Sequence, residues 1–123
     1  QRQMCIRDSN ITYPIAIDVE AIENDSFRQE NLSASELTDV IIAFCDTIKA
    51  AGYTPLIYSN LLYFMDNVEL ERLEGYDKWF AGYQTASPYY PYKYAMWQYT
   101  STGSINGVSG NVDINIAMKN LKK

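Results

Sequence analysis

The sequence predicts an α/β fold, an incomplete TIM-like barrel in which strand–helix units come first and strands without helices come last. Three observations predict it. Between residues 15 and 59, an apolar strand, an amphipathic helix and a second strand follow one another. Two later strand-like segments are joined by QTASPYYPY, nine residues with two prolines, which leaves no room for a crossover helix. The whole chain has 123 residues, whereas a complete (β/α)₈ barrel needs about 250.

The first predicted strand lies in YPIAIDVEAIE, residues 13–23, and ends in two acids. Successive side chains of a strand point to opposite faces. Ile15, Ile17 and Val19 therefore share an apolar face. Ala16, Asp18 and Glu20 share the other face, which is acidic.

A helix is predicted from Ser33 to Ala51. Ser33 and Glu36 match an S-x-x-E capping box, and Gly52 provides the stop signal. The apolar positions recur at helical spacing and predict one buried face, with Cys45 as a core thiol: Leu37, Val40, Ile41, Phe44, Cys45 and Ile48. The next strand, 55–59, completes a βαβ unit with a parallel, right-handed strand pair.

The second half of the chain contains shorter elements. Helical turns are predicted at 61–65 and 69–73, and strands at 77–83, 93–99 and 111–117. The Gly- and Ser-rich segment STGSINGVSG before the last strand predicts a turn or tight hairpin.

Composition excludes several classes of function. The net charge of −5, with only 10 basic residues, disfavours nucleic acid as a partner. No apolar run reaches the roughly 18 residues of a membrane span. The chain has no histidine, which removes His-based nucleophilic sites and most zinc sites. Hydrolytic chemistry must therefore depend on carboxylates.

The first nine residues, QRQMCIRDS, differ from the rest of the chain. They lack helical or strand periodicity and have no apolar signal-peptide core. We expect residues 1–9 to be a non-native segment, similar to a translated sequencing adaptor, and residues 10–123 to be the native part; an ordinary ragged terminus is the alternative.

Four segments together carry a family resemblance: PIAIDVE, LIYSN, KWFAGY and MWQYTSTGSINGVSGNVDIN. In this order and spacing they resemble the strand motifs of glycoside hydrolase family 25 lysozymes, the Chalaropsis-type N-acetylmuramidases, from Tyr13 to the C-terminus. The resemblance implies a (β/α)₅(β)₃ barrel. It also implies hydrolysis of the β-1,4 bond between N-acetylmuramic acid and N-acetylglucosamine in peptidoglycan, without a cofactor or metal.

The resemblance implies three catalytic acids. Glu20 matches the proton donor, Asp18 its partner in the D-x-E motif, and Asp113 the aspartate of the last strand. Independently of the family, two acids at i and i+2 lie about 7 Å apart at Cα, and their repulsion favours one protonated and one ionised carboxyl. The alternatives are a solvated strand end for Asp18 and Glu20, and a salt-bridged or turn aspartate for Asp113.

Aromatic side chains provide the candidate sugar contacts, because the C–H faces of sugars stack on rings and the chain is 14% aromatic. Tyr58 resembles a cleft tyrosine of the family, and strand alternation places Gln98 opposite Trp97. Core packing is an equal alternative for each aromatic. The full set of predicted substrate-binding residues is Tyr58, Trp79, Tyr83, Trp97 and Gln98.

The family pattern also has a first strand with an active-site aspartate and three β/α units before D-x-E, which this sequence lacks. We therefore expect the C-terminal part of a muramidase domain, with exposed sheet edges, poor stability and little activity. A catalytically inactive saccharide-binding module and, more remotely, a metal-dependent sugar transferase are the alternatives. The expected partner is the peptidoglycan glycan strand. We expect the full-length protein to be a monomer, secreted or delivered to the cell wall by a phage.

Overall fold

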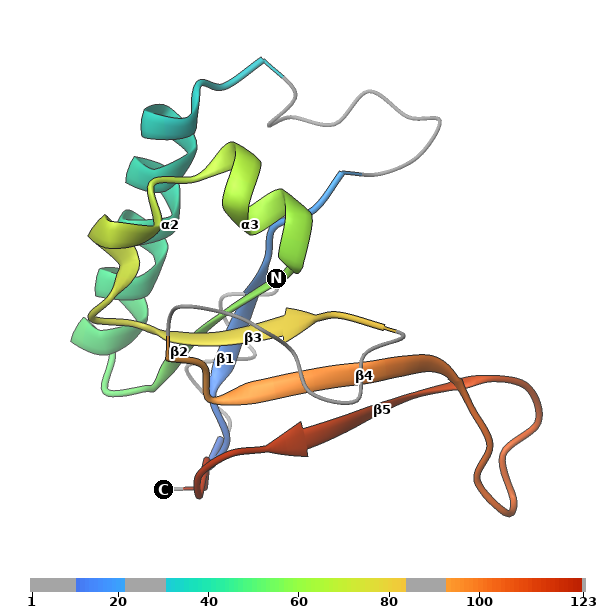
Figure 1. Ribbon diagram of the computed structural model, residues 1–123. Helices are drawn as coiled ribbons and strands as arrows, with labels where there is room; N and C mark the ends of the chain where they lie inside the picture. Colours follow the sequence, from blue (N-terminus) through green and yellow to red (C-terminus); the bar gives the residue numbers. More distant parts are fainter. Residues whose placement is uncertain (1–10, 22–30, 84–92, 123) are drawn as a thin grey trace.

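Five strands form one open, curled sheet in the computed structural model, which describes residues 11–21, 31–83 and 93–122. The strands follow chain order across the sheet (Figure 1). The first four strands are parallel and the last is antiparallel to its neighbour. This half-barrel confirms the predicted α/β class and the incomplete barrel. The strands are β1 (Ile15–Asp18), β2 (Pro55–Asn60), β3 (Asp77–Ala81), β4 (Met96–Gly103) and β5 (Val112–Ala117).

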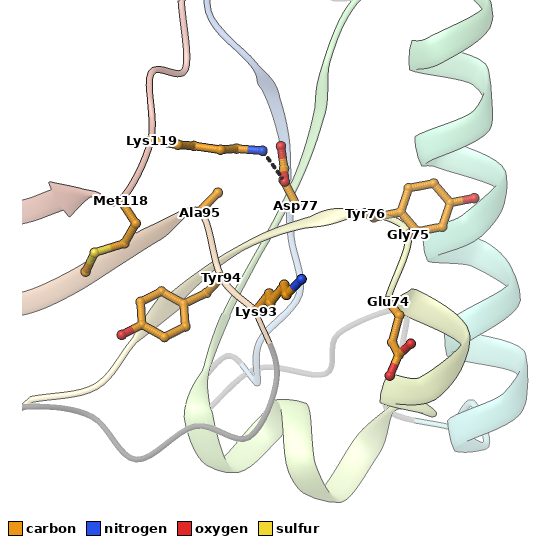
Figure 2. A pocket seen from close by; sticks show the side chains of 9 residues that line it. All are labelled: Glu74, Gly75, Tyr76, Asp77, Lys93, Tyr94, Ala95, Met118 and Lys119. Atoms are coloured by element: carbon orange, nitrogen blue, oxygen red, sulfur yellow. Dashed lines mark hydrogen bonds and ion pairs between the residues drawn. The ribbon is translucent and has the colours of Figure 1, made fainter.

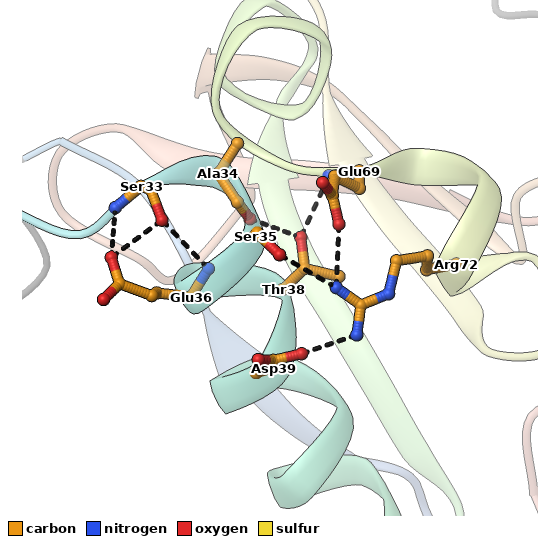
Figure 3. A network of polar contacts seen from close by, with 8 residues as sticks. All are labelled: Ser33, Ala34, Ser35, Glu36, Thr38, Asp39, Glu69 and Arg72. Carbon is orange, nitrogen blue, oxygen red and sulfur yellow. Dashed lines mark hydrogen bonds and ion pairs between the residues drawn. The ribbon is translucent and has the colours of Figure 1, made fainter.

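Helix α2 (Ala34–Ala50) has the predicted capping box. The Glu36 backbone N–H donates to Ser33 Oγ at 3.3 Å, and the Ser33 N–H donates back to Glu36 Oε2 at 2.9 Å (Figure 3). These two bonds satisfy donors that a helix start otherwise leaves unpaired. Gly52 follows the helix with φ of 86°, a conformation that favours glycine. The helix therefore begins and ends where the local sequence predicts.

The apolar core lies between the helices and one face of the sheet. Figure 1 shows α2 and the short helix α3 (Leu61–Asn67) on this side, and both helices contact β2. Cys45 is fully buried, as predicted, and burial raises the pKa of its thiol to about 11. Val40 was predicted to be in the core but is 50% exposed. The buried stripe of α2 runs instead through Leu37, Ile41, Cys45 and Ile48.

Polar contacts fix the 3₁₀ helix η1 (Leu70–Leu73) against α2 (Figure 3). Thr38 Oγ1 donates to the Ala34 carbonyl at 2.6 Å and accepts from the Glu69 N–H at 2.9 Å. Arg72 forms ion pairs with Asp39 and Glu69, at 2.5 and 2.7 Å. Because these ion pairs are exposed to solvent, they add little to the stability of the fold. The buried Thr38 hydroxyl therefore gives the more specific link between α2 and η1.

The ends of several elements differ from the prediction. β4 was predicted at 93–99 but runs to Gly103, into the segment assigned to a turn. Antiparallel pairing with β5 extends it, with register shifts at Thr100 and Gly103. β1 ends at Asp18 and β3 at Ala81. α3 and η1 confirm the two predicted helical segments. The predicted non-native residues 1–9 and the proline-containing link 84–92 lie outside the described residues.

Candidate active site

The two acids of the first strand lie at the carboxyl end of β1. Asp18 is the last residue of the strand, and its register partner across the parallel pair is Tyr58. Loss of hydration raises the pKa of the Asp18 carboxyl. The pKa of Glu20 is raised first by desolvation and then by the negative charge of Asp18. A raised pKa keeps a carboxyl protonated at higher pH, which suits a general acid.

A cavity of about 520 Å³ lies beside Glu20. Tyr58 and Asn60 line it from β2, and Tyr83 lines it from the residues after β3. These residues belong to the carboxyl ends of three parallel strands, the end at which barrel enzymes place their active sites. The remaining lining residues are Leu61, Leu62, Ala81 and Gly82.

Gln98 of β4 joins the two tyrosines of this cavity. The Tyr58 hydroxyl donates to Gln98 Oε1 at 2.9 Å, and the Tyr83 hydroxyl donates to the same oxygen at 2.7 Å. Gln98 is buried, with 4% of the residue exposed. One amide oxygen of β4 therefore holds one side chain from β2 and one from the residues after β3.

Trp79 extends the same face of the sheet toward β5. Its ring packs edge-on against Tyr58, with centroids 4.7 Å apart, and its Nε1–H donates to Asn115 Oδ1 at 2.8 Å. Asn115 was not among the predicted site residues. A signal was available in the sequence, because Asn115 is two residues from Asp113 on the same strand and shares its face.

Asp113 belongs to the same electrostatic environment as the β1 acids. Burial raises the pKa of the Tyr58 hydroxyl well above its usual range, and the charges of Glu20, Tyr83, Asp18 and Asp113 raise it further. Acids from β1 and β5 thus act on one hydroxyl in the middle of the sheet. Register, cavity lining, hydrogen bonds and ring contacts bring together six of the predicted site residues: Asp18, Glu20, Tyr58, Trp79, Tyr83 and Gln98. Asp113 is exposed on β5 and acts on this group only through its charge.

Trp97 lies elsewhere. It was predicted as a sugar contact, but it is 8% exposed and belongs to the apolar core on the helix side, with Phe80 as its register partner. Its Nε1–H donates to the Gly82 carbonyl at 2.9 Å. Neighbouring residues of a strand point to opposite faces, so a Gln98 side chain that bonds to Tyr58 and Tyr83 leaves Trp97 on the core side.

A second cavity, of about 510 Å³, lies at the opposite end of the sheet (Figure 2). It is lined by the start of β3 and by residues just after β5, and it contains the 2.6 Å ion pair between Lys119 and Asp77. None of the predicted catalytic acids lines it. The acid-lined cavity at the carboxyl ends of the strands is therefore the candidate active site.

No described helix combines the length and the apolar character that would let it cross a membrane.

Comparison with known proteins gives consistent matches. The sequence pattern of glycosyl hydrolases family 25 matches residues 2–108. The autolytic lysozyme of Clostridium acetobutylicum is 27% identical over 99 residues, which are 80% of this chain and 28% of that protein. A D-alanyl-L-alanine endopeptidase of Streptococcus phage B30 is 32% identical over 87 residues, 61% of this chain and 20% of that protein.

A solved structure is also similar. The modular autolysin LytC of Streptococcus pneumoniae, in complex with a synthetic peptidoglycan ligand, superposes with a TM-score of 0.70 at 26% identity. The match covers 93% of this chain and 28% of LytC. The chain thus spans between a fifth and a third of the length of these relatives. Since the family pattern extends over most of the sequence and the fold agrees, the chain belongs to glycosyl hydrolases family 25.

Proposed function

We propose that this chain carries the acid-bearing half of a peptidoglycan muramidase site. The bond cleaved is the β-1,4 linkage between N-acetylmuramic acid and N-acetylglucosamine, at the bacterial cell wall, after secretion or phage delivery. The observation that carries the proposal is the position of Glu20, whose carboxyl pKa is raised and which lines a cavity together with Tyr58 and Tyr83. The similarity to an autolytic lysozyme supports the same reaction class.

Glu20 acts as the general acid in this proposal. It transfers its proton to the glycosidic oxygen as the bond between that oxygen and the anomeric carbon breaks. The anomeric carbon then carries positive charge, and the carboxylates of Asp18 and Asp113 stabilise it electrostatically. Water supplies the hydroxyl of the new reducing end, and its other proton returns to Glu20. Two carboxylates and one carboxylic acid are enough for this chemistry.

Tyr58, Trp79, Tyr83 and Gln98 form the proposed sugar-binding surface. The edge-on pair of Tyr58 and Trp79 presents aromatic surface on the cavity side of the sheet. Rings of this kind bury the C–H faces of pyranoses, and a few fixed polar groups orient the sugar. Trp97 is left out, because it lies in the core.

The unpaired edges of the sheet support the expectation that the isolated chain has low activity and associates with itself. In the described sheet, β1 and β5 are both edge strands, and these strands carry or precede the three acids. Unpaired edges expose backbone donors and acceptors to other chains. A catalytic group on an edge strand is also held less firmly than one on a strand paired on both sides.

The test compares Glu20→Gln with Glu71→Gln, a matched change at an exposed acid on η1. Each variant is prepared in the chain itself and in a chimera in which residues 11–123 replace the matching segment of the Clostridium acetobutylicum lysozyme. Release of new reducing ends from purified peptidoglycan is measured. We expect Glu20→Gln to lower the rate of the chimera by at least about 100-fold and Glu71→Gln to leave it unchanged.

Two results would contradict the proposal. Equal rates for Glu20→Gln and the unchanged chimera would remove Glu20 as the acid. Binding of peptidoglycan fragments without hydrolysis by either protein would favour the alternative, a catalytically inactive saccharide-binding module.

A further inference from the structure

We propose that Asn115 of β5 is a positioning residue that holds the Trp79 indole against Tyr58. Tyr58 lines the cavity beside Glu20, so the inference rests on the proposed function, in which that cavity binds the glycan. It adds a residue from the far edge of the sheet, which acts on the cavity through other side chains and does not line it.

A hydrogen bond joins β3 to β5 across the strand that lies between them. The Trp79 Nε1–H donates to Asn115 Oδ1 at 2.8 Å. In the register of the sheet, Trp79 is the partner of Met96 in β4, and Asn115 is the partner of Gln98, two residues further along the same face of β4. The bond therefore holds the indole over β4, on the face of the sheet that carries Gln98.

The backbone of Asn115 belongs to the regular part of the β4–β5 ladder. Three consecutive antiparallel pairs, of which Gln98 and Asn115 are the last, are in unbroken register. Beyond this pair, toward Asp113, the register shifts at Thr100 and again at Gly103. Asn115 is thus the residue nearest to the irregular part whose own pairing is regular, and its side chain starts from a well-defined position.

The chemistry of the indole explains why an asparagine suits this position. An indole N–H is a donor only, so the Asn115 amide must present its oxygen to Trp79. A carboxylate would also accept this bond. However, Asp113 lies two residues away on the same face of β5, and a second carboxylate there would repel it. Asparagine supplies the acceptor without adding a charge.

The other edge of the indole system contacts Tyr58. The two ring centroids are 4.7 Å apart and the ring planes are inclined by 62°, an edge-to-face contact whose energy depends on orientation. Tyr58 also donates to Gln98, the register partner of Asn115. Four side chains from four consecutive strands are therefore successive neighbours in a closed ring: Tyr58, Trp79, Asn115 and Gln98.

Loss of the Asn115 acceptor would open this ring at the edge strand. Trp79 and Asn115 are both half-buried, so water would replace the lost partner and the indole would no longer be held in one orientation. Tyr58 would then lose a fixed wall of its surroundings. A side chain that a ligand needs in one position binds best when its neighbours already hold it there.

The first test follows the two indole N–H signals of the 15N-labelled 123-residue chain by NMR. Trp97, whose indole donates to the Gly82 carbonyl, is the internal reference. Asn115→Leu removes the acceptor at a similar side-chain volume, so the Trp79 signal should move upfield and exchange with water about tenfold faster, the effect of one net hydrogen bond. Asn115→Asp retains an acceptor and should retain the shift and the slow exchange. The Trp97 signal should be unchanged in both variants.

The second test measures hydrolysis of soluble peptidoglycan fragments by the chimera described above. Asn115→Leu should raise KM by about tenfold and change kcat by less than about threefold, because it weakens substrate binding and leaves the acids in place. Asn115→Asp should return KM to within about threefold of the unchanged chimera. Asn111→Leu, the same exchange at an exposed residue just before β5, is the control and should change neither constant.

Three results would overturn the proposal. The first is a Trp79 signal that is the same in Asn115→Leu as in the unchanged chain. The second is a Trp79 signal that moves together with that of Trp97, since this would show general loosening of the fold. The third is an unchanged KM in Asn115→Leu.

Failure here is distinct from failure of the muramidase proposal. The indole signals are read in the chain itself and decide whether Asn115 holds Trp79 even where the chimera does not hydrolyse peptidoglycan, a result that would contradict the muramidase proposal. An effect of Asn115→Leu on KM without an effect of Glu20→Gln on the rate would support this inference alone.

Discussion

Asp18 and Tyr58 lie directly opposite one another in the parallel register of β1 and β2, at the carboxyl end of both strands. The same tyrosine packs against Trp79, donates to Gln98 and lies in the field of Asp113. Tyr58 thereby connects the acids of β1 with the polar side chains of the later strands. Ionisation of the Tyr58 hydroxyl is therefore the most direct measurement of whether these groups come together in solution.

Tyr58 should ionise later than the other tyrosines in an alkaline titration. Burial raises the pKa of its hydroxyl, and four negatively charged or ionisable neighbours, Glu20 first among them, raise it further. In Tyr58→Phe, the last step of the tyrosinate absorbance titration should disappear. Tyr76→Phe is a matched control, because the bond of its hydroxyl to Asp46 raises the pKa of Tyr76 to about 12 by a different route. A late step that persists in Tyr58→Phe would contradict the predicted environment.

Asp18→Asn should move the alkaline limb of hydrolytic activity to lower pH. Glu20 must be protonated to act as the acid, so activity falls as pH rises through the pKa of Glu20. The charge of Asp18 helps to raise that pKa, and its removal lets Glu20 lose its proton earlier. The maximum rate should fall as well, but the pH at which activity drops to half of its maximum is measured independently of that maximum. The measurement is the pH profile of reducing-end release by the chimera; an unshifted or alkaline-shifted limb would show that the two carboxyls are not coupled.

Glu20→Gln should stabilise the fold at neutral pH. A carboxyl with a raised pKa holds its proton more tightly when folded than when unfolded, so folding is penalised as pH rises through its ionisation range. Removing the charge should raise Tm by about 1–3 °C at neutral pH and leave it unchanged near pH 3, where both states are protonated. Glu71→Gln, at an exposed position, is the control. A lower Tm at neutral pH would mean that the ionised Glu20 is stabilised by its surroundings.

Ser59→Ala should increase the free energy of unfolding by about 1 kcal/mol. A buried hydroxyl without a partner has lost its hydrogen bonds to water and forms none in the protein to replace them. Ser59 is fully buried on the core face of β2, and its Oγ has no hydrogen-bond partner among the described residues. Urea unfolding measures the change, with Ser104→Ala at an exposed position as the control. A loss of stability would indicate that the hydroxyl is hydrated or bonded in solution.

The elements that depend on neighbouring residues were predictable from the sequence. The Ser33 and Glu36 cap and the spacing from Leu37 to Ile48 define α2, and alternation around Asp18 correctly gave the acidic face of β1. These signals are local, because a cap or a periodic face needs only a few adjacent residues. The order of helical segments before helix-free strands followed from the same kind of signal.

The remaining features depend on contacts between distant segments. Alternation separates Trp97 from Gln98 but does not say which of the two faces the helices, and here the indole packs in the core. β4 reaches Gly103 because β5 pairs with it, and a Cβ at Gly103 would overlap the Ile114 side chain. Alternation places Asn115 on the face of Asp113, but its bond to Trp79 joins residues 36 positions apart. None of these three contacts is encoded within a short window of sequence.

The order of the strands has a consequence for biosynthesis. Every described strand pairs with the one that precedes it in the chain, from β1 through β5. A nascent polypeptide with this arrangement can extend its sheet one strand at a time as it leaves the ribosome, since each new strand finds its neighbour already made. Gln98, the acceptor for both tyrosines, emerges after the two residues that it joins. The cavity side of the sheet is therefore organised only once β4 has been made, after α2, α3 and the first three strands.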